Sequence, residues 1–247
     1  MLFSLCSTCS ERVPGDASEV MDEDERVVLE SNGWRLVGEW RVPPGSKPVP
    51  AVLLLHRAAG SRGEYAALAE ALATRGVASL RLDLRGHGNS DNLGRFEEPY
   101  AENRGVLENT HEDINVALRW IAAHPRVDAD RLGAVGTSYS GEAIGEALRA
   151  GGETVAAYVM LSPGSFSDES IAHVDASAAP WLFIRTSEEN EISLEFIDAV
   201  FDALVGHSES AEIRVIPGAG HATGIFDTHP FIIEQIADWL AHRLGAP

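Results

Sequence analysis

The feature that most constrains the fold is a repeated alternation of short apolar runs with amphipathic segments. The run at 51–55 reads AVLLL, which is typical of a strand buried on both faces. Similar runs lie at 77–82, 132–136, 155–161, 181–184 and 213–216, and two earlier strands are expected at 26–30 and 34–42. Helices are expected at 63–75, 110–121, 142–150, 197–204 and 230–240. This alternation predicts a parallel sheet with right-handed crossovers in one α/β domain.

Some of these helices carry boundary signals of their own. Gly76 follows the segment 63–75 and is a favourable residue just beyond a helix end. Thr110 opens the sequence Thr-His-Glu-Asp, which resembles a capping box at the start of a helix. Pro230 suits the first turn of the last helix, because its fixed φ is already helical.

The N-terminal residues differ in composition from the rest of the chain. Residues 10–25 are polar and acidic, so we expect 1–25 to form a flexible acidic arm ahead of a domain at 26–247. Cys6 and Cys9 form a lone pair within this arm. A structural zinc site needs four ligands, so we interpret the pair as part of an unstructured leader and expect no metal there.

Charge excludes several classes of partner. The chain carries 19 basic and 38 acidic residues, a net charge of −19. Such a surface repels phosphate, which argues against nucleic acid and against anionic membranes as partners. Residues 1–9 are mildly apolar but lack a basic start and an Ala-x-Ala cleavage site. We therefore expect a cytoplasmic protein, with an exported form carrying a truncated signal segment as the alternative.

The strongest chemical signal is the sequence Gly136-Thr137-Ser138-Tyr139-Ser140-Gly141. It lies between an apolar run and a helical segment, which is the strand–turn–helix setting of a nucleophile elbow. The tight turn needs small residues two positions before and after the nucleophile, and Gly136 and Ser140 meet this need. The helix that follows directs its N-terminus at Ser138, where its dipole favours developing negative charge. We predict Ser138 as a nucleophile; the alternative is a serine in an ordinary βα turn.

A serine hydroxyl needs a base, and the base needs an orienting acid. Among nine histidines, His221 lies in a glycine-rich loop directly after the last expected strand. We predict it as the base, with a surface loop histidine as the alternative. The acid should follow the strand near 181–184, where residues 186–191 (TSEENE) supply three glutamates. The residue pattern leaves the choice among them open.

Over residues 30–245 the chain resembles the α/β-hydrolase superfamily, in its dienelactone-hydrolase-like and serine esterase branches. The motifs are HRAAG at 56–60, like the family's His-Gly-x-x-Gly oxyanion loop, DLRGHGNS at 83–90, VDADRLG at 127–133 and GAGH at 218–221. The resemblance implies an eight-stranded, mostly parallel sheet flanked by helices, and no cofactor. It also implies an oxyanion hole formed by the backbone N–H groups of Ala58 and Tyr139. The segment 162–180 is too short for the helical cap domain that many members insert there.

The chain departs from the family pattern at several positions. Arg57 stands where a glycine usually precedes the oxyanion donor. Ser138 stands where true dienelactone hydrolases carry cysteine, so their particular reaction is not implied. The long loop at 89–109 carries Phe96 and Tyr100, which either line a shallow pocket or anchor the loop.

The position of the acid depends on how the irregular turn is counted. Counting from Pro180 selects Glu189, with Glu188 as the second choice. Counting back from the next helix selects Asn190, which cannot act as a carboxylate, and Asp168 is then the next candidate.

Together these features predict a capless serine hydrolase that cleaves small carboxylic esters with the triad Ser138, Glu189 and His221. One alternative is a peptidase or amidase of the prolyl-oligopeptidase-like type. Another is a non-catalytic binding protein that keeps the hydrolase fold, which Arg57 and the irregular acid turn motivate.

Overall fold

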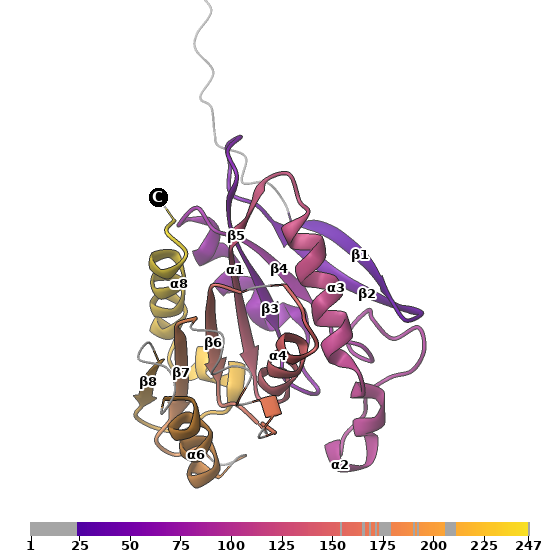
Figure 1. The fold of residues 1–247 in the computed structure, drawn as a ribbon. Helices are drawn as coiled ribbons and strands as arrows, with labels where there is room; N and C mark the ends of the chain where they lie inside the picture. The colour runs from indigo at the N-terminus through magenta and orange to yellow at the C-terminus, as the bar shows by residue number, and fades with distance from the viewer. Residues whose placement is uncertain are drawn as a thin grey trace, which may run out of the picture.

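A single eight-stranded sheet runs through the centre of the molecule (Figure 1). The computed structural model describes residues 24–246 except 154, 165, 168, 171, 173–178, 190, 192 and 206–210. The strands are β1 (Glu25–Ser31), β2 (Trp34–Arg41), β3 (Val49–Leu55), β4 (Ala78–Leu82), β5 (Val127–Thr137), β6 (Ala157–Leu161), β7 (Trp181–Thr186) and β8 (Ala211–Ile216). Their order is β1-β2-β4-β3-β5-β6-β7-β8. Strands β3 to β8 pair in parallel, and β2 is antiparallel to both of its neighbours. The predicted α/β-hydrolase sheet is confirmed.

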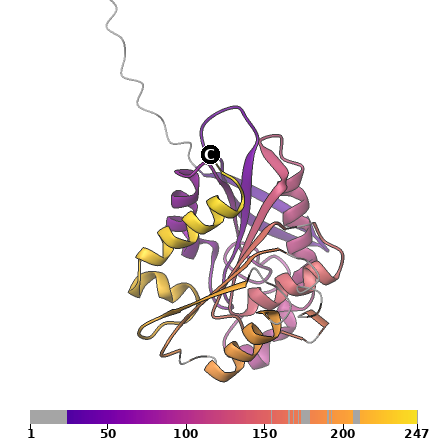
Figure 2. The same ribbon diagram turned by 60° about the vertical axis from the view of Figure 1, so that its left-hand side comes forward.

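Helices cover both faces of this sheet, as the turned view in Figure 2 shows. Helices α1 (Ala66–Ala73) and α8 (Phe231–Arg243) pack on one face. Helices α3 (Thr110–Ala122), α4 (Tyr139–Arg149) and α6 (Leu194–Val205) lie on the other. Short helical turns include η1 (Arg62–Tyr65), α2 (Tyr100–Asn103), η2 (Arg104–Leu107), η3 (Ala222–Gly224) and α7 (Ile225–Thr228). None of the helices in the described ranges is long and apolar enough to cross a membrane.

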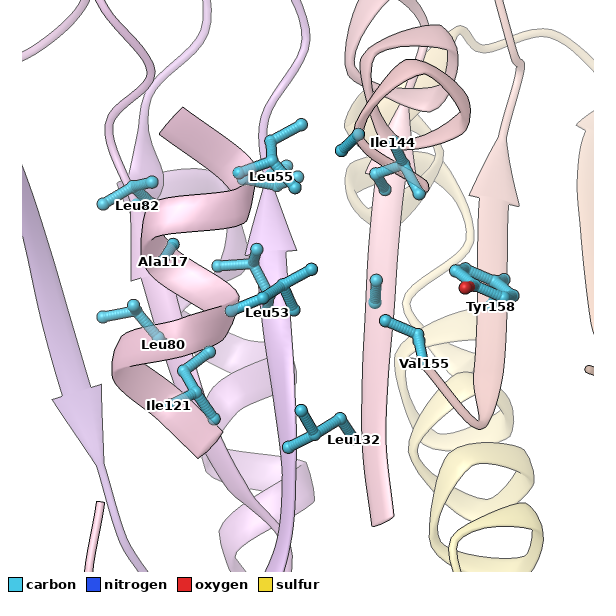
Figure 3. Close-up of a cluster of buried hydrophobic side chains, with 14 of the residues drawn as sticks. Leu53, Leu55, Leu80, Leu82, Ala117, Ile121, Leu132, Ile144, Val155 and Tyr158 are labelled. Atoms are coloured by element: carbon cyan, nitrogen blue, oxygen red, sulfur yellow. The ribbon is translucent and has the colours of Figure 1, made fainter. Parts of the chain in front are cut away.

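The continuous apolar run of β3 is explained by burial on both faces. Leu53 and Leu55 point into the core beneath α3 and α4, whereas Val52 and Leu54 point into the core beneath α1 and α8. Figure 3 labels part of the first core: Leu53, Leu55, Leu80, Leu82, Ala117, Ile121, Leu132, Ile144, Val155 and Tyr158. Successive side chains of a strand point to opposite faces, so a central strand needs apolar residues at every position.

The sheet begins slightly earlier than the sequence predicted. Glu25 already pairs with Trp40, so it belongs to β1 and not to the expected arm at 1–25. Asp24 forms ion pairs with Arg41 and Arg81, which fixes the start of this strand. The rest of the expected arm, including the cysteine pair, lies outside the described residues.

The expected capping box at the start of α3 is wrong. The residue before the helix is Asn109, in the left-handed region with φ 64°, and Thr110 is the first helical residue. The Thr110 hydroxyl donates to the carbonyl of Leu107 at 2.7 Å. Asp113 is fully buried and accepts two hydrogen bonds from the Arg85 guanidinium, each of 2.6 Å. Asp113, which the capping-box pattern assigns to the helix N-terminus, therefore pairs instead with Arg85, a residue distant in the sequence.

Candidate active site

Ser138 lies between the end of β5 and the start of α4, in the setting of a nucleophile elbow. Its backbone has φ 49° and ψ −122°, a combination that residues other than glycine adopt only under strain. The Ser138 N–H donates to Leu161 of β6 at 3.0 Å, and its carbonyl accepts from Gly141 and Gly164 at 3.1 Å each. These three hydrogen bonds hold the strained turn, and the hydroxyl is presented at a partly exposed position.

The small residues on either side of Ser138 have distinct tasks. A Cβ at Gly136 would lie 2.8 Å from Ile144 and 3.0 Å from the backbone of Gly141, so a side chain does not fit there. Ser140 is fully buried, and its hydroxyl accepts from the Thr137 N–H at 2.8 Å and donates to the carbonyl of Leu55 at 2.9 Å. A serine is thus accommodated at 140 without leaving a buried hydroxyl unsatisfied.

His221 and Glu189 meet after the last two strands of the sheet. The Nδ1 atom of His221 lies 3.1 Å from Oε2 of Glu189, with side chains that are 5% and 0% exposed. The loops that carry them are joined by a hydrogen bond from the Thr186 hydroxyl to the carbonyl of Gly220, of 2.8 Å. Glu189 and His221 are distant in the sequence, and the pairing of the parallel neighbours β7 and β8 brings them together in space.

The environment of Glu189 favours its ionised form. Burial by itself raises the pKa of this carboxyl, but the neighbouring imidazole of His221, the Glu191 N–H and the nearby Ser162 together lower it by more than burial raises it. The pKa therefore lies below its ordinary value, and the group is a carboxylate at neutral pH. The hydrogen bond from the Glu191 N–H to Oε1 is 3.0 Å long.

The other candidates for the acid do not share this position. Glu188 is exposed, and its backbone N–H donates to Gly218 at 2.9 Å. Glu191 is 59% exposed, and its Oε2 lies 3.8 Å from Nε2 of His221, on the side away from Glu189. Asn190 and Asp168 lie outside the described residues.

One cavity of about 330 Å³ contains the predicted nucleophile, base and oxyanion donors together. Its lining residues are Arg57, Ala58, Glu98, Tyr100, Ser138, Tyr139, Gly164, Glu191 and His221. No local sequence signal marks Glu98, Gly164 and Glu191 as lining residues, because only the folding of separate loops brings them to this cavity. Among the described residues, no cluster of three or more His, Cys, Asp or Glu side chains could hold a metal ion.

The predicted oxyanion loop (56–60), which follows β3, is held by two buried histidines. Ala59 has φ 58°, and its N–H donates to Nε2 of His87 at 3.1 Å. His56 accepts from the Leu84 N–H through Nε2 at 3.0 Å, and its ring lies 4.8 Å from that of His87. Both act as acceptors, so both must be neutral, and burial lowers the pKa of His56 to about 4 and that of His87 below its ordinary value. The DLRGHGNS motif therefore supports the predicted oxyanion loop through His87.

The long loop at 89–109 combines the two roles that the sequence left open. Phe96 is buried and stacks on His87 with ring centroids 5.0 Å apart, so it anchors the loop. Tyr100 is 40% exposed and lines the cavity that holds Ser138. The loop thus packs against His87 through Phe96 and forms one wall of the cavity through Tyr100.

The mostly parallel sheet and the strained serine between β5 and α4 define an α/β-hydrolase. Residues 46–185, more than half of the chain, match the model of a family described as serine aminopeptidase, S33, and the chain belongs to this family of hydrolases.

Two relatives illustrate what the sequence is similar to. An uncharacterized protein of Mycobacterium tuberculosis H37Rv, Rv2307c, is 33% identical over 173 residues, covering 68% of this chain and 54% of that protein. The chain therefore spans about half the length of that relative. A probable 2-oxo-3-(5-oxofuran-2-ylidene)propanoate lactonase of Bradyrhizobium is 27% identical over 201 residues, covering 75% of this chain and 79% of the lactonase.

Solved structures with the same fold include two esterases. The Pyrococcus furiosus esterase Pf2001 superposes with a TM-score of 0.71 at 16% identity, over 95% of this chain and 97% of the esterase. A cold-adapted esterase from an Arctic intertidal metagenomic library gives a TM-score of 0.71 at 17% identity, over 95% and 99% of the two chains. At these identities the likeness establishes the fold.

Proposed function

We propose that this hydrolase cleaves small carboxylic esters through an acyl-enzyme intermediate. The observation that carries the proposal is the shared cavity of Ser138 and His221, together with the 3.1 Å contact between His221 and the buried Glu189. A strained serine, an imidazole and a desolvated carboxylate in this relation are the components of a serine-hydrolase triad.

The first half of the reaction forms an ester between the substrate's acyl group and Ser138. The Ser138 oxygen attacks the carbonyl carbon while Nε2 of His221 takes the hydroxyl proton. The resulting oxyanion accepts hydrogen bonds from the N–H groups of Ala58 and Tyr139, each worth about 2.7–4 kcal/mol of barrier in comparable enzymes. The alcohol then leaves as the C–O bond breaks, and it receives the proton from His221.

The second half repeats this sequence with water. Nε2 of His221 takes a proton from water as the water oxygen attacks the acyl carbon. Collapse of the second oxyanion breaks the bond to Ser138, and the proton returns to the serine oxygen. Throughout, the Glu189 carboxylate fixes the tautomer of His221 and stabilises its charged form.

The cavity and the relatives guide the choice of substrate. A volume of about 330 Å³ lies at the lower end of the range for small-molecule sites, which favours esters with short acyl groups. A lactone is a cyclic ester, so the name of the Bradyrhizobium relative fits the same acyl-transfer chemistry. The family description favours amide or peptide cleavage as the second candidate. Matched ester and amide substrates with the same acyl group distinguish the two.

Replacing Ser138 tests the proposal directly. We expect Ser138→Ala to abolish hydrolysis of p-nitrophenyl acetate and butyrate, and to abolish labelling by a fluorophosphonate probe, while circular dichroism remains unchanged. Ser46→Ala, at an exposed loop position, serves as the matched control and should retain both properties. Substantial hydrolysis by Ser138→Ala would refute the assignment. A wild-type chain that neither labels nor hydrolyses any substrate would support the non-catalytic alternative.

A further inference from the structure

Two of the loops that surround the cavity meet at the carboxylate of Glu64. Glu64 belongs to η1, and its Oε2 accepts a hydrogen bond of 2.8 Å from the hydroxyl of Thr223. Its Oε1 lies 3.5 Å from Nε of Arg57. Thr223 follows His221 by two residues, and Arg57 directly precedes Ala58. One carboxylate therefore contacts both the loop of the predicted base and the loop of a predicted oxyanion donor.

The carboxylate fits closely against the oxyanion loop. The turn there is closed by a hydrogen bond of 3.1 Å from the Gly60 N–H to the carbonyl of Arg57. A Cβ at Gly60 would lie 2.8 and 2.9 Å from the two carboxylate oxygens of Glu64. The Glu64 carboxylate thus occupies the space over this turn that a side chain at position 60 would need. Thr223, which donates to this carboxylate, is buried.

The charges around Glu64 account for the unusual residue at position 57. Burial is the main influence on Glu64 and raises its pKa, and nearby Asp227 acts in the same direction. The Thr223 hydrogen bond and the positive charge of Arg57 oppose this effect. A partly buried carboxylate needs such compensation to remain ionised. The family's usual glycine at 57 would remove this positive charge. Arg57 therefore compensates for the partly buried negative charge of Glu64.

We propose that Glu64 is a positioning residue. Through Arg57 and Thr223 it holds the predicted oxyanion loop (56–60) and the loop that carries His221 in a fixed position relative to each other. This inference rests on the proposed function, in which Ala58 and His221 must act on the same reacting group. A displacement of about 1 Å in such a site can cost about 10²-fold in rate. Glu64 itself does not line the cavity, so its effect reaches the substrate only through its two neighbours.

The test compares Glu64→Leu, which removes the contacts with both Arg57 and Thr223, with Thr223→Val, which removes only the second contact. Both variants keep side-chain size. We expect each to lower kcat on a p-nitrophenyl ester by roughly tenfold or more, with KM changed less than about twofold. Affinity for a boronic-acid transition-state analogue should fall in parallel with kcat/KM. Glu70→Gln, at an exposed position of α1, is the matched control and should leave kcat unchanged.

The double variant shows whether the two residues act as one link. If they do, Glu64→Leu with Thr223→Val should be about as slow as the slower single variant, because the link is already broken. Rate losses that simply multiply would overturn the coupling. Melting temperatures that fall while kcat stays at the wild-type value would show a structural role only and overturn the inference.

The outcome for the wild-type chain separates this inference from the proposed function. If wild-type protein is labelled at Ser138 and hydrolyses esters, unchanged kcat in both single variants refutes the role of Glu64 alone. If wild-type protein is neither labelled nor active, the proposed function fails and this inference fails with it.

Discussion

At the scale of single residues, three glutamates close together in the sequence occupy different environments. Glu188 faces solvent, Glu189 is buried against His221, and Glu191 lies at the cavity beside the other imidazole nitrogen. Desolvation makes a carboxylate's interaction with a neighbouring charge much stronger than it is in water. Only Glu189 combines burial with contact to Nδ1, so we expect only Glu189 to affect the chemistry strongly.

We predict that Glu189→Gln keeps the fold and loses most of the activity. An amide of the same shape does not stabilise the imidazolium, and amide replacement of a triad carboxylate lowers kcat by up to about 10⁴-fold. Glu188→Gln is the matched control and should be nearly silent, because a solvated carboxylate contributes little. The measurement is kcat on a p-nitrophenyl ester. A large loss at 188 with little loss at 189 would contradict the assignment.

At the scale of elements, a buried ion pair joins the turn after β4 to helix α3. The Arg85 guanidinium donates two hydrogen bonds of 2.6 Å to Asp113, and both side chains are almost completely buried. Arg85 belongs to the motif whose His87 supports the predicted oxyanion loop. The pair therefore fixes the position of α3 relative to the base of the candidate site.

We predict that Arg85→Met lowers the free energy of unfolding by about 3–5 kcal/mol, because it leaves the charge of Asp113 buried without its partner. The double variant Arg85→Met with Asp113→Leu removes both charges and should be more stable than the single variant. Urea denaturation measures both. A double variant that is less stable than Arg85→Met would contradict this account of the pair.

At the scale of the whole molecule, acid should destabilise the fold through its buried histidines. The pKa of His56 is about 4 in the folded chain, against an ordinary value of 6.5. Above pH 6.5 the imidazole is neutral in both the folded and the unfolded state, and it contributes no pH dependence. Below that value the unfolded chain binds a proton that the folded chain rejects, so stability falls as the pH decreases from 6.5 towards 4.

His56→Gln isolates this contribution, since glutamine does not titrate. We predict that the free energy of unfolding falls less steeply between pH 6.5 and 4.5 in this variant than in the wild type. NMR titration of the wild-type chain provides a second measurement that does not depend on the variant's folding. An imidazole of His56 that takes up its proton near pH 6.5 would refute the prediction.

Removal of residues 1–23 is the second whole-molecule prediction. Residues 10–23 are polar and acidic and residues 1–9 only mildly apolar, so the segment has little apolar surface to bury, and a chain that starts at Asp24 should melt close to the full-length temperature. Asp24 is retained because it pairs with Arg41 and Arg81. A fall of many degrees in a thermal melt would show that the N-terminal residues contribute to the folded domain.

The sequence by itself determined the order and type of the main elements and two members of the candidate site. Continuous apolar runs such as the one in β3 are produced by burial on both faces, which is a property that local sequence records directly. Ser138 and His221 were identified because each lies in a short segment whose local pattern implies its backbone setting. These features depend on neighbours within a few residues along the chain.

Tertiary structure decided the features that depend on contacts between distant segments. The choice of Glu189 over Glu188 follows from which side chain faces His221, and a shift of one residue in an irregular turn changes that. The predicted capping box at Thr110 does not form, because Asp113 pairs with Arg85, which lies far away in the sequence. The contact of Glu64 with Arg57 and Thr223 likewise joins separate loops. Burial and charge pairing across the fold outweigh local preferences at these positions, because a desolvated charge is costly without its partner.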